Sequence, residues 1–167
     1  MPSQTDCDNL GRYVANQYIV DSATTKGSKI LTSTFTVDPY DAADILYAFE
    51  GYGKYAVEVK TRNGDYSDYF YEVKKDKRLQ EYKQQGYTII YANVIEDNQR
   101  LYMWDVTDIT KVKGVQTKFA PCFVSTYNNP TITGKFVYTL PVSSAFINVD
   151  ATEYIRQYKQ LTNADNQ

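Results

Sequence analysis

The stretch YDAADILYAFEGYGKYAVEVKTR, residues 40–62, contains two apolar runs on either side of Gly51-Tyr52-Gly53. Runs rich in β-branched and aromatic residues that flank a glycine-containing turn are typical of an antiparallel hairpin. We therefore predict one strand over Ala43–Phe49 and a second over Tyr55–Thr61. This hairpin would fix which side chains share a face of the sheet.

Pairing across this hairpin sets Asp44 opposite Lys60 and Leu46 opposite Glu58. Because side chains alternate along a strand, Asp44, Glu58 and Lys60 are predicted to emerge on one face. Asp41 is an alternative to Asp44, but the same pairing places it on the opposite face from Glu58. Two carboxylates and an ammonium gathered in this way would bind Mg²⁺ and polarise a phosphodiester.

The composition is that of a globular protein. The 167 residues fit one domain, 1–167, with 43% hydrophobic and 23% charged residues. No apolar run is long enough to cross a membrane, and the N-terminus lacks a signal-peptide pattern, so a cytoplasmic protein is expected. Cys7 and Cys122 are too few for a disulfide framework and are interpreted as thiols in a reducing compartment.

The chain contains no histidine, which excludes Ser-His-Asp and Cys-His catalysis and the zinc sites that need histidine. Catalysis would have to use carboxylates, lysine, tyrosine or a metal. The net charge of −2 and the pI near 5.2 argue against a broad cationic surface for nucleic acid. The net charge therefore argues against an enzyme that acts on nucleic acid, whereas the two carboxylates and the lysine of the hairpin argue for one.

Helices and strands are predicted to alternate along the remaining chain. Capping residues, Gly86 and the apolar periodicity predict helices over Asp8–Val20, over Asp68–Gln85 and from Asp150 to about Leu161. Alternating or β-rich runs predict strands over Lys29–Val37, Thr88–Ile95, Arg100–Val106, Thr117–Tyr127 and Thr131–Leu140. The expected fold is a single α/β (α+β) domain with a mixed sheet, in which Tyr55–Thr61 and Thr88–Ile95 lie near the middle.

The predicted metal ligands are the carboxylates of Asp44 and Glu58 with the carbonyl oxygen of Val59. Mg²⁺, or Mn²⁺ in its place, takes such hard oxygen ligands and lowers the pKa of bound water. Lys60 would orient the attacking water or offset charge in the transition state. The plainer interpretation is a surface hairpin with a cross-strand Asp–Lys pair.

Glu72 and Lys75 share a stripe of the predicted 68–85 helix with Leu79. A charged pair on an inward stripe suggests an accessory role at the site, and residues three apart on a helix can also meet each other. The alternative is that both side chains reach from the rim of the core into solvent.

Three tyrosines beside the predicted site, Tyr66, Tyr69 and Tyr71, are candidates for stacking on nucleic-acid bases. Packing in the core is the default explanation for the other aromatic residues.

The order helix, strand, Asp-bearing strand, Glu-x-Lys strand, helix, strand resembles the PD-(D/E)XK nuclease superfamily, with its restriction-endonuclease-like αβββαβ core. The segments YDAAD, AVEVKTRN, EVKKDKRL, GYTIIYANVI and LYMWDV resemble small stand-alone phage and bacterial members. The resemblance covers about residues 8–106, and PCFVSTYNNPTITGKFVYTLP is similar to a C-terminal hairpin of that group, which with a final helix occupies 115–161. It implies Asp44, Glu58 and Lys60 as the active-site triad, with Glu72 and Lys75 as an accessory pair.

One departure concerns the first helix, where many members of that superfamily carry a metal-binding Glu. Asp8–Val20 contains none, so either Gln17 substitutes or metal affinity is weaker. The expected function is a metal-dependent endo- or exonuclease acting on DNA. The alternatives are an RNA-directed or toxin-like nuclease, and a catalytically silent module such as a phage particle component or an inhibitor. Each of these functions is compatible with a homodimer or with a phage or host protein as partner. If the protein is phage-encoded, we expect it in the host cytoplasm or in the virion.

Overall fold

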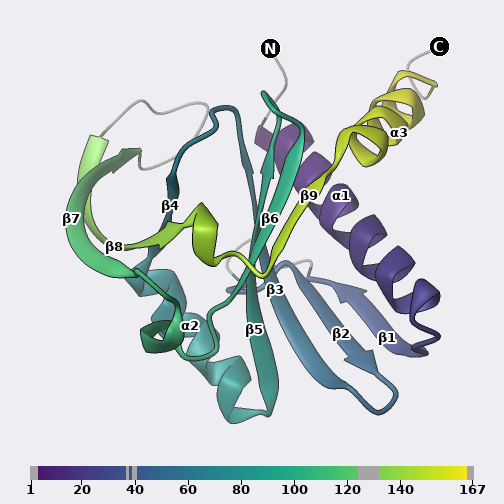
Figure 1. Cartoon of the computed structure of the whole chain (residues 1–167), viewed down its shortest axis with the longest axis horizontal. Helices are drawn as coiled ribbons and strands as arrows, with labels where there is room; N and C mark the ends of the chain where they lie inside the picture. Colours follow the sequence, from purple (N-terminus) through teal and green to yellow (C-terminus); the bar gives the residue numbers. More distant parts are fainter. Residues whose placement is uncertain (1–3, 37, 39–40, 124–131, 165–167) are drawn as a thin grey trace.

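The computed structural model describes residues 4–36, 38, 41–123 and 132–164. A six-stranded mixed sheet forms the middle layer, and Figure 1 shows α1 and α3 on one face with α2 and a three-stranded sheet on the other. The strand order is β1-β2-β3-β5-β6-β9 in the large sheet and β4-β8-β7 in the small one. The helices are α1 (Gln4–Thr25), α2 (Val73–Gln84) and α3 (Thr152–Ala164), and the strands are β1 (Ile30–Phe35), β2 (Ile45–Phe49), β3 (Gly53–Arg62), β4 (Asp68–Glu72), β5 (Tyr87–Ile95), β6 (Arg100–Asp105), β7 (Gln116–Phe123), β8 (Ile132–Pro141) and β9 (Ile147–Asp150).

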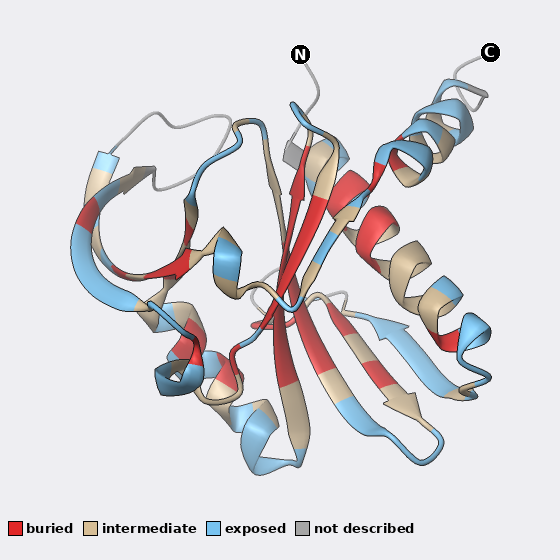
Figure 2. Ribbon diagram, in the orientation of Figure 1, coloured by how far each residue is buried: buried red, intermediate tan, exposed pale blue. Residues whose placement is uncertain are grey.

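The centre of the large sheet is the parallel pair β3 and β5, which confirms the predicted central strands. Both are covered on two faces: Val57 and Val59 belong to the core under α1 and α3, whereas Ala56 belongs to the core under α2. Figure 2 shows the buried residues concentrated along these strands and β6. The predicted αβββαβ order is also present, with β4 added between the third strand and α2.

The hairpin of β2 and β3 pairs in a register that differs from the predicted one. Leu46 lies opposite Ala56 rather than Glu58, and Phe49 pairs with Gly53 across a tight connection. The turn is shorter than the sequence suggested because Gly51 and Gly53 take positive φ angles of 76° and 89°. The shift is an even number of residues, so every side chain keeps its predicted face.

Helix α1 lies unusually close to β3 because Gly11 has no side chain. A Cβ atom at Gly11 would stand 2.5 Å from Thr61 Oγ1 and 3.1 Å from Val59 Cγ1. The Thr61 hydroxyl donates a hydrogen bond of 2.6 Å to the Cys7 carbonyl oxygen. This contact brings the N-terminal half of the helix next to the Glu-x-Lys strand.

The predicted helix over Asp68–Gln85 is wrong in its first turn. Asp68–Glu72 forms β4, which pairs with β8, and the helix begins at Val73 and ends before Gly86, whose φ is +85°. The strand β4, with its Tyr-Phe-Tyr sequence, is stabilised by pairing with a strand far along the chain. Helix propensity depends on local residues only, so it does not predict this pairing.

The predicted C-terminal hairpin is present as β7 and β8, which join β4 in the small sheet. The predicted turn at Asn128-Asn129-Pro130 lies outside the described residues. The short edge strand β9 was not predicted. Across the ranges that the structure describes, no helix combines the length and hydropathy that a membrane span requires.

Candidate active site

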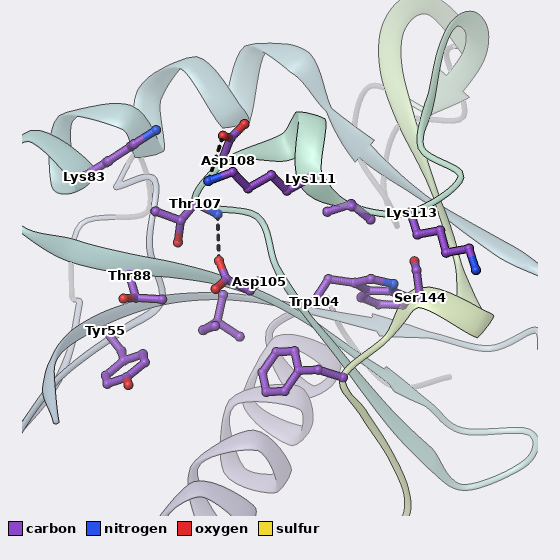
Figure 3. A pocket seen from close by; sticks show the side chains of 13 residues that line it. Tyr55, Lys83, Thr88, Trp104, Asp105, Thr107, Asp108, Lys111, Lys113 and Ser144 are labelled. Carbon is purple, nitrogen blue, oxygen red and sulfur yellow. Dashed lines mark hydrogen bonds and ion pairs between the residues drawn. The ribbon is translucent and has the colours of Figure 1, made fainter.

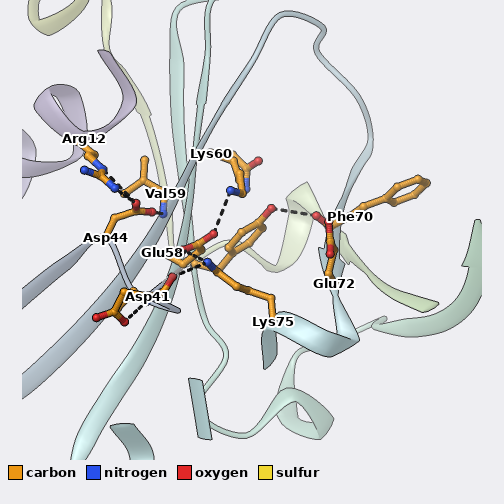
Figure 4. A network of polar contacts seen from close by, with 12 residues as sticks. Arg12, Asp41, Asp44, Glu58, Val59, Lys60, Phe70, Glu72 and Lys75 are labelled. Atoms are coloured by element: carbon orange, nitrogen blue, oxygen red, sulfur yellow. Dashed lines mark hydrogen bonds and ion pairs between the residues drawn. The ribbon is translucent and has the colours of Figure 1, made fainter. Parts of the chain in front are cut away.

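A buried glutamate lies at the centre of the polar network in Figure 4. Glu58 on β3 is 1% exposed, and an ammonium group faces each of its carboxylate oxygens. Lys60 Nζ lies 3.1 Å from Oε1, and Lys75 Nζ of α2 lies 3.0 Å from Oε2. Within the described part of the chain neither oxygen has a hydrogen-bond partner of good geometry. The carboxylate is thus balanced in charge but keeps lone pairs free for a further ligand.

Burial sets the protonation of Glu58. Removal from water raises the pKa of Glu58 to about 7, against the opposing pull of Lys60 and with a further upward contribution from Asp44. The Glu58 charge in turn raises the pKa of Lys60, which stays protonated at neutral pH. Glu58 therefore changes charge near neutrality while its neighbour Lys60 stays protonated.

Asp44 stands at the start of β2, where its backbone N–H donates to the Val57 carbonyl oxygen. The Val59 N–H donates to Asp44 Oδ2 at 2.7 Å, and the Arg12 guanidinium of α1 contacts Oδ1 at 2.6 Å. Burial alone would raise the pKa of Asp44, but these hydrogen bonds and the charge of Lys60 lower it overall. Asp44 is consequently ionised throughout the neutral range.

The structure adds an acid that sequence reasoning interpreted only as a helix cap. Asp8 lies inside α1, one turn before Arg12, and interacts electrostatically with Lys60 and Asp44. Burial, followed by the charge of Asp44, raises the pKa of Asp8, whereas Lys60 and Arg12 lower it. The i, i+4 spacing of Asp8 and Arg12 was the available signal. Gln17, the predicted substitute on this helix, takes part in none of the contacts described here.

The predicted accessory pair is divided. Lys75 contacts Glu58 and also donates to the Asp41 carbonyl oxygen at 3.2 Å, so it belongs to the cluster. Glu72 ends β4 instead of lying within the helix, and its carboxylate pairs with Lys135 of β8 at 2.7 Å. Glu72 and Lys75, which one helix could have brought together, therefore belong to different elements and have different ion-pair partners.

Asp41, the alternative to Asp44, supports the loop before β2. Its carboxylate accepts hydrogen bonds from the Tyr82 hydroxyl at 2.8 Å and from the Ala43 N–H at 3.2 Å. Its backbone carbonyl holds Lys75. Asp41 therefore positions a member of the cluster through its main chain.

Two of the three tyrosines considered for base stacking are buried. Tyr69 and Tyr71 are 2% and 1% exposed, and both rings belong to the core between the two sheets. The Tyr71 hydroxyl donates to the buried carboxylate of Asp76. Tyr66, at 62% exposure, is the member of the trio whose ring is accessible.

The described residues contain no group of three or more His, Cys, Asp or Glu side chains that could hold a metal ion. A site for Mg²⁺ would thus combine Asp44 and Glu58 with the carbonyl oxygen of Val59 and water. Two buried Glu58 oxygens without hydrogen-bond partners fit this donor set, since a cation would satisfy them.

A hollow of about 890 Å³ lies elsewhere on the molecule (Figure 3). Its charged side chains include Lys83, Lys113 and a Lys111–Asp108 pair 3.5 Å apart. None of the candidate catalytic residues lines it. We place the candidate site at Glu58 because a buried carboxylate with a strongly shifted pKa between two lysines is a chemical feature, whereas the size of a hollow alone is not.

No protein-family model matches this chain, and no curated protein matches it. Among solved structures, it is similar to that of Hjc, a Holliday junction resolvase from the archaeal hyperthermophile Archaeoglobus fulgidus. The TM-score is 0.46 with 12% identity, over 82% of this chain and 96% of that chain.

Proposed function

We propose that this protein is a metal-dependent nuclease that cleaves DNA at the Asp44–Glu58–Lys60 cluster. The observation that carries the proposal is the environment of Glu58, a buried carboxylate with a lysine at each oxygen and, among the residues that the structure describes, no hydrogen-bond partner of good geometry. A buried charge of this kind is costly to a fold and is typical of a functional group. The absence of histidine leaves carboxylate and lysine chemistry as the route to hydrolysis.

Each residue has a role that follows from its contacts. Asp44 and Glu58, with the Val59 carbonyl, would hold a divalent cation, which supplies positive charge and lowers the pKa of water. Lys60 Nζ is protonated, so it would orient the attacking water and offset negative charge on the phosphoryl oxygens rather than remove a proton. Lys75 fixes the second oxygen of Glu58, and Arg12 fixes Asp44, so both carboxylates are oriented before substrate arrives.

The test is a cleavage assay with single-stranded, duplex and branched DNA, and with RNA, at increasing Mg²⁺ or Mn²⁺. We expect Asp44→Asn and Lys60→Met each to lower turnover by at least a hundredfold, in line with the loss of a charge at a phosphoryl-transfer centre. Arg156→Gln is the matched control, because Arg156 pairs with Glu153 on the exposed surface of α3. Wild-type protein without activity on any of these substrates at any metal concentration would refute the nuclease.

A second candidate is a module with this fold that binds but does not cleave. Both Asp44 oxygens already accept hydrogen bonds, and the described residues provide no three-carboxylate cluster. Calorimetry separates the two candidates. A nuclease binds Mg²⁺ and loses that binding in Glu58→Gln, whereas a silent module shows no Mg²⁺ binding in either protein.

A further inference from the structure

The strand that carries Glu58 and Lys60 continues to a third charged side chain on the same face. Arg62 follows Lys60 by two residues, which places it about 7 Å further along the strand. Its partners lie on the neighbouring strand β5. The guanidinium donates to the Asn93 carbonyl oxygen Oδ1 through Nε and to the Tyr91 hydroxyl through Nη2, each at 3.4 Å. These bonds are long, so they orient the guanidinium without satisfying it.

No carboxylate in the described residues forms an ion pair with Arg62. The acid with the strongest electrostatic influence on it is Glu72, which is already bound by Lys135 at 2.7 Å. A guanidinium has five N–H donors, and the bonds to Asn93 and Tyr91 use two of them. The remaining donors of this half-buried group have no acceptor among the described residues.

The groups that hold Arg62 are themselves fixed. Asn93 is completely buried, and its Nδ2 has no hydrogen-bond partner within the described ranges, which is uncommon for an interior amide. The Tyr91 hydroxyl donates to the Phe70 carbonyl oxygen at 2.9 Å. A buried amide and an anchored phenol therefore orient a cation that forms no ion pair with a described carboxylate.

A planar fork of free N–H donors matches an anion with several oxygens, and phosphate is the anion that nucleic acid provides along its whole length. The backbone offset of about 7 Å between Arg62 and Lys60 allows the two side chains to contact successive phosphates of one nucleic-acid strand. We propose that Arg62, positioned by Tyr91 and Asn93, binds the backbone phosphate next to the one that is cleaved. This inference rests on the proposed function, because it takes the Glu58 cluster as the place of cleavage.

The first experiment measures binding without chemistry. Fluorescence anisotropy of labelled single-stranded and duplex DNA, in EDTA and at several salt concentrations, compares wild type with Arg62→Gln. We expect affinity to fall five- to tenfold and the salt dependence to decrease by about one counter-ion. Arg100→Gln is the matched control, because Arg100 also bonds an asparagine, Asn148, but on an exposed edge of the sheet.

The second experiment identifies the phosphate. In wild type, replacing backbone phosphates one at a time by neutral methylphosphonate should weaken binding most at one position beside the cleaved bond. In Arg62→Gln the same replacement should cost nothing further, because the two changes remove one interaction. Arg62→Lys keeps the positive charge and is the variant to use in the same binding experiment if Arg62→Gln does not fold. It should retain the salt dependence but lose affinity, since an ammonium cannot hold Asn93, Tyr91 and a phosphate together.

The outcomes separate this inference from the nuclease itself. If DNA is cleaved but Arg62→Gln binds with unchanged affinity and salt dependence, the inference is overturned and the nuclease stands. If no DNA is cleaved and the Arg62 variants still lose one phosphate contact, the inference stands and the nuclease fails. Absence of measurable binding of wild type to every oligonucleotide overturns the inference.

Discussion

Replacing Glu58 by Gln should make the metal-free protein more stable above neutral pH while abolishing cleavage. Glu58 is 1% exposed, so an isosteric substitution is needed; alanine would leave a cavity whose cost obscures the charge effect. Glutamine fills the same volume and behaves as a carboxyl group that never ionises. The variant therefore isolates the cost of the buried charge.

The magnitude follows from the pKa of Glu58, which rises from 4.5 in the unfolded chain to about 7 in the folded protein. A carboxyl with a raised folded pKa favours the fold below its unfolded pKa, and this contribution is lost as pH increases through the folded pKa. At about 1.4 kcal/mol per pH unit, ionisation of Glu58 costs about 3 kcal/mol of folding free energy above pH 8, and less than about 1 kcal/mol at pH 5.

The assay is urea unfolding of both proteins in EDTA at pH 5 and pH 9. Glu58→Gln should exceed wild type by about 3 kcal/mol at pH 9 and nearly match it at pH 5. Mg²⁺ should stabilise wild type at pH 9 and have no effect on the variant. Glu72→Gln is the control, because its half-exposed carboxylate pairs with Lys135 at the surface. Parallel pH profiles for wild type and Glu58→Gln would refute the argument from burial.

Three further substitutions test the surroundings of Glu58. Lys75→Met removes a charge that lowers the pKa of Glu58, so the pH midpoint of Mg²⁺ binding should move upward by about one unit in a calorimetric titration; an unchanged midpoint contradicts the Lys75 contact. Glu72→Gln should leave turnover unchanged and cost less than about 1 kcal/mol in urea unfolding, as for a surface ion pair; lost turnover would restore Glu72 to the site. Gly11→Ala should cost about 1–3 kcal/mol and weaken Mg²⁺ binding, because the added Cβ meets Thr61 Oγ1 at 2.5 Å and pushes α1 from the sheet; wild-type stability would show that the helix does not press on β3.

The faces of the hairpin were predictable from the sequence because alternation along a strand is a local property. The predicted pairing register of the hairpin was wrong, but the error was an even number of residues. The residues predicted to share a face with Glu58 were therefore still correct. The central position of β3 and β5 followed from their apolar composition. These features depend on neighbouring residues, which a single sequence displays.

The missing features depend on contacts between distant parts of the chain. β4 was interpreted as helix because its stabilising partner, β8, lies far along the sequence. Asp8 and Arg12 lie close to Asp44 because Gly11 allows α1 to approach β3. No local sequence pattern predicts this approach of the helix to the strand. The sequence identified the acids and the lysines as candidates, but it did not indicate that Lys75 would serve Glu58 while Glu72 would not.

The alternation of β3 has a consequence for motion. Val57 and Val59 are held in the core beneath α1, and Glu58 is the residue between them. Its carboxylate cannot be displaced along the strand unless two core side chains leave their places and the ladder to Tyr91 breaks. We therefore expect the Glu58 and Val59 amides to exchange hydrogen only through global unfolding. Loss of the site and loss of the fold would then be one cooperative event, so the protein has no folded form in which this carboxylate is out of position.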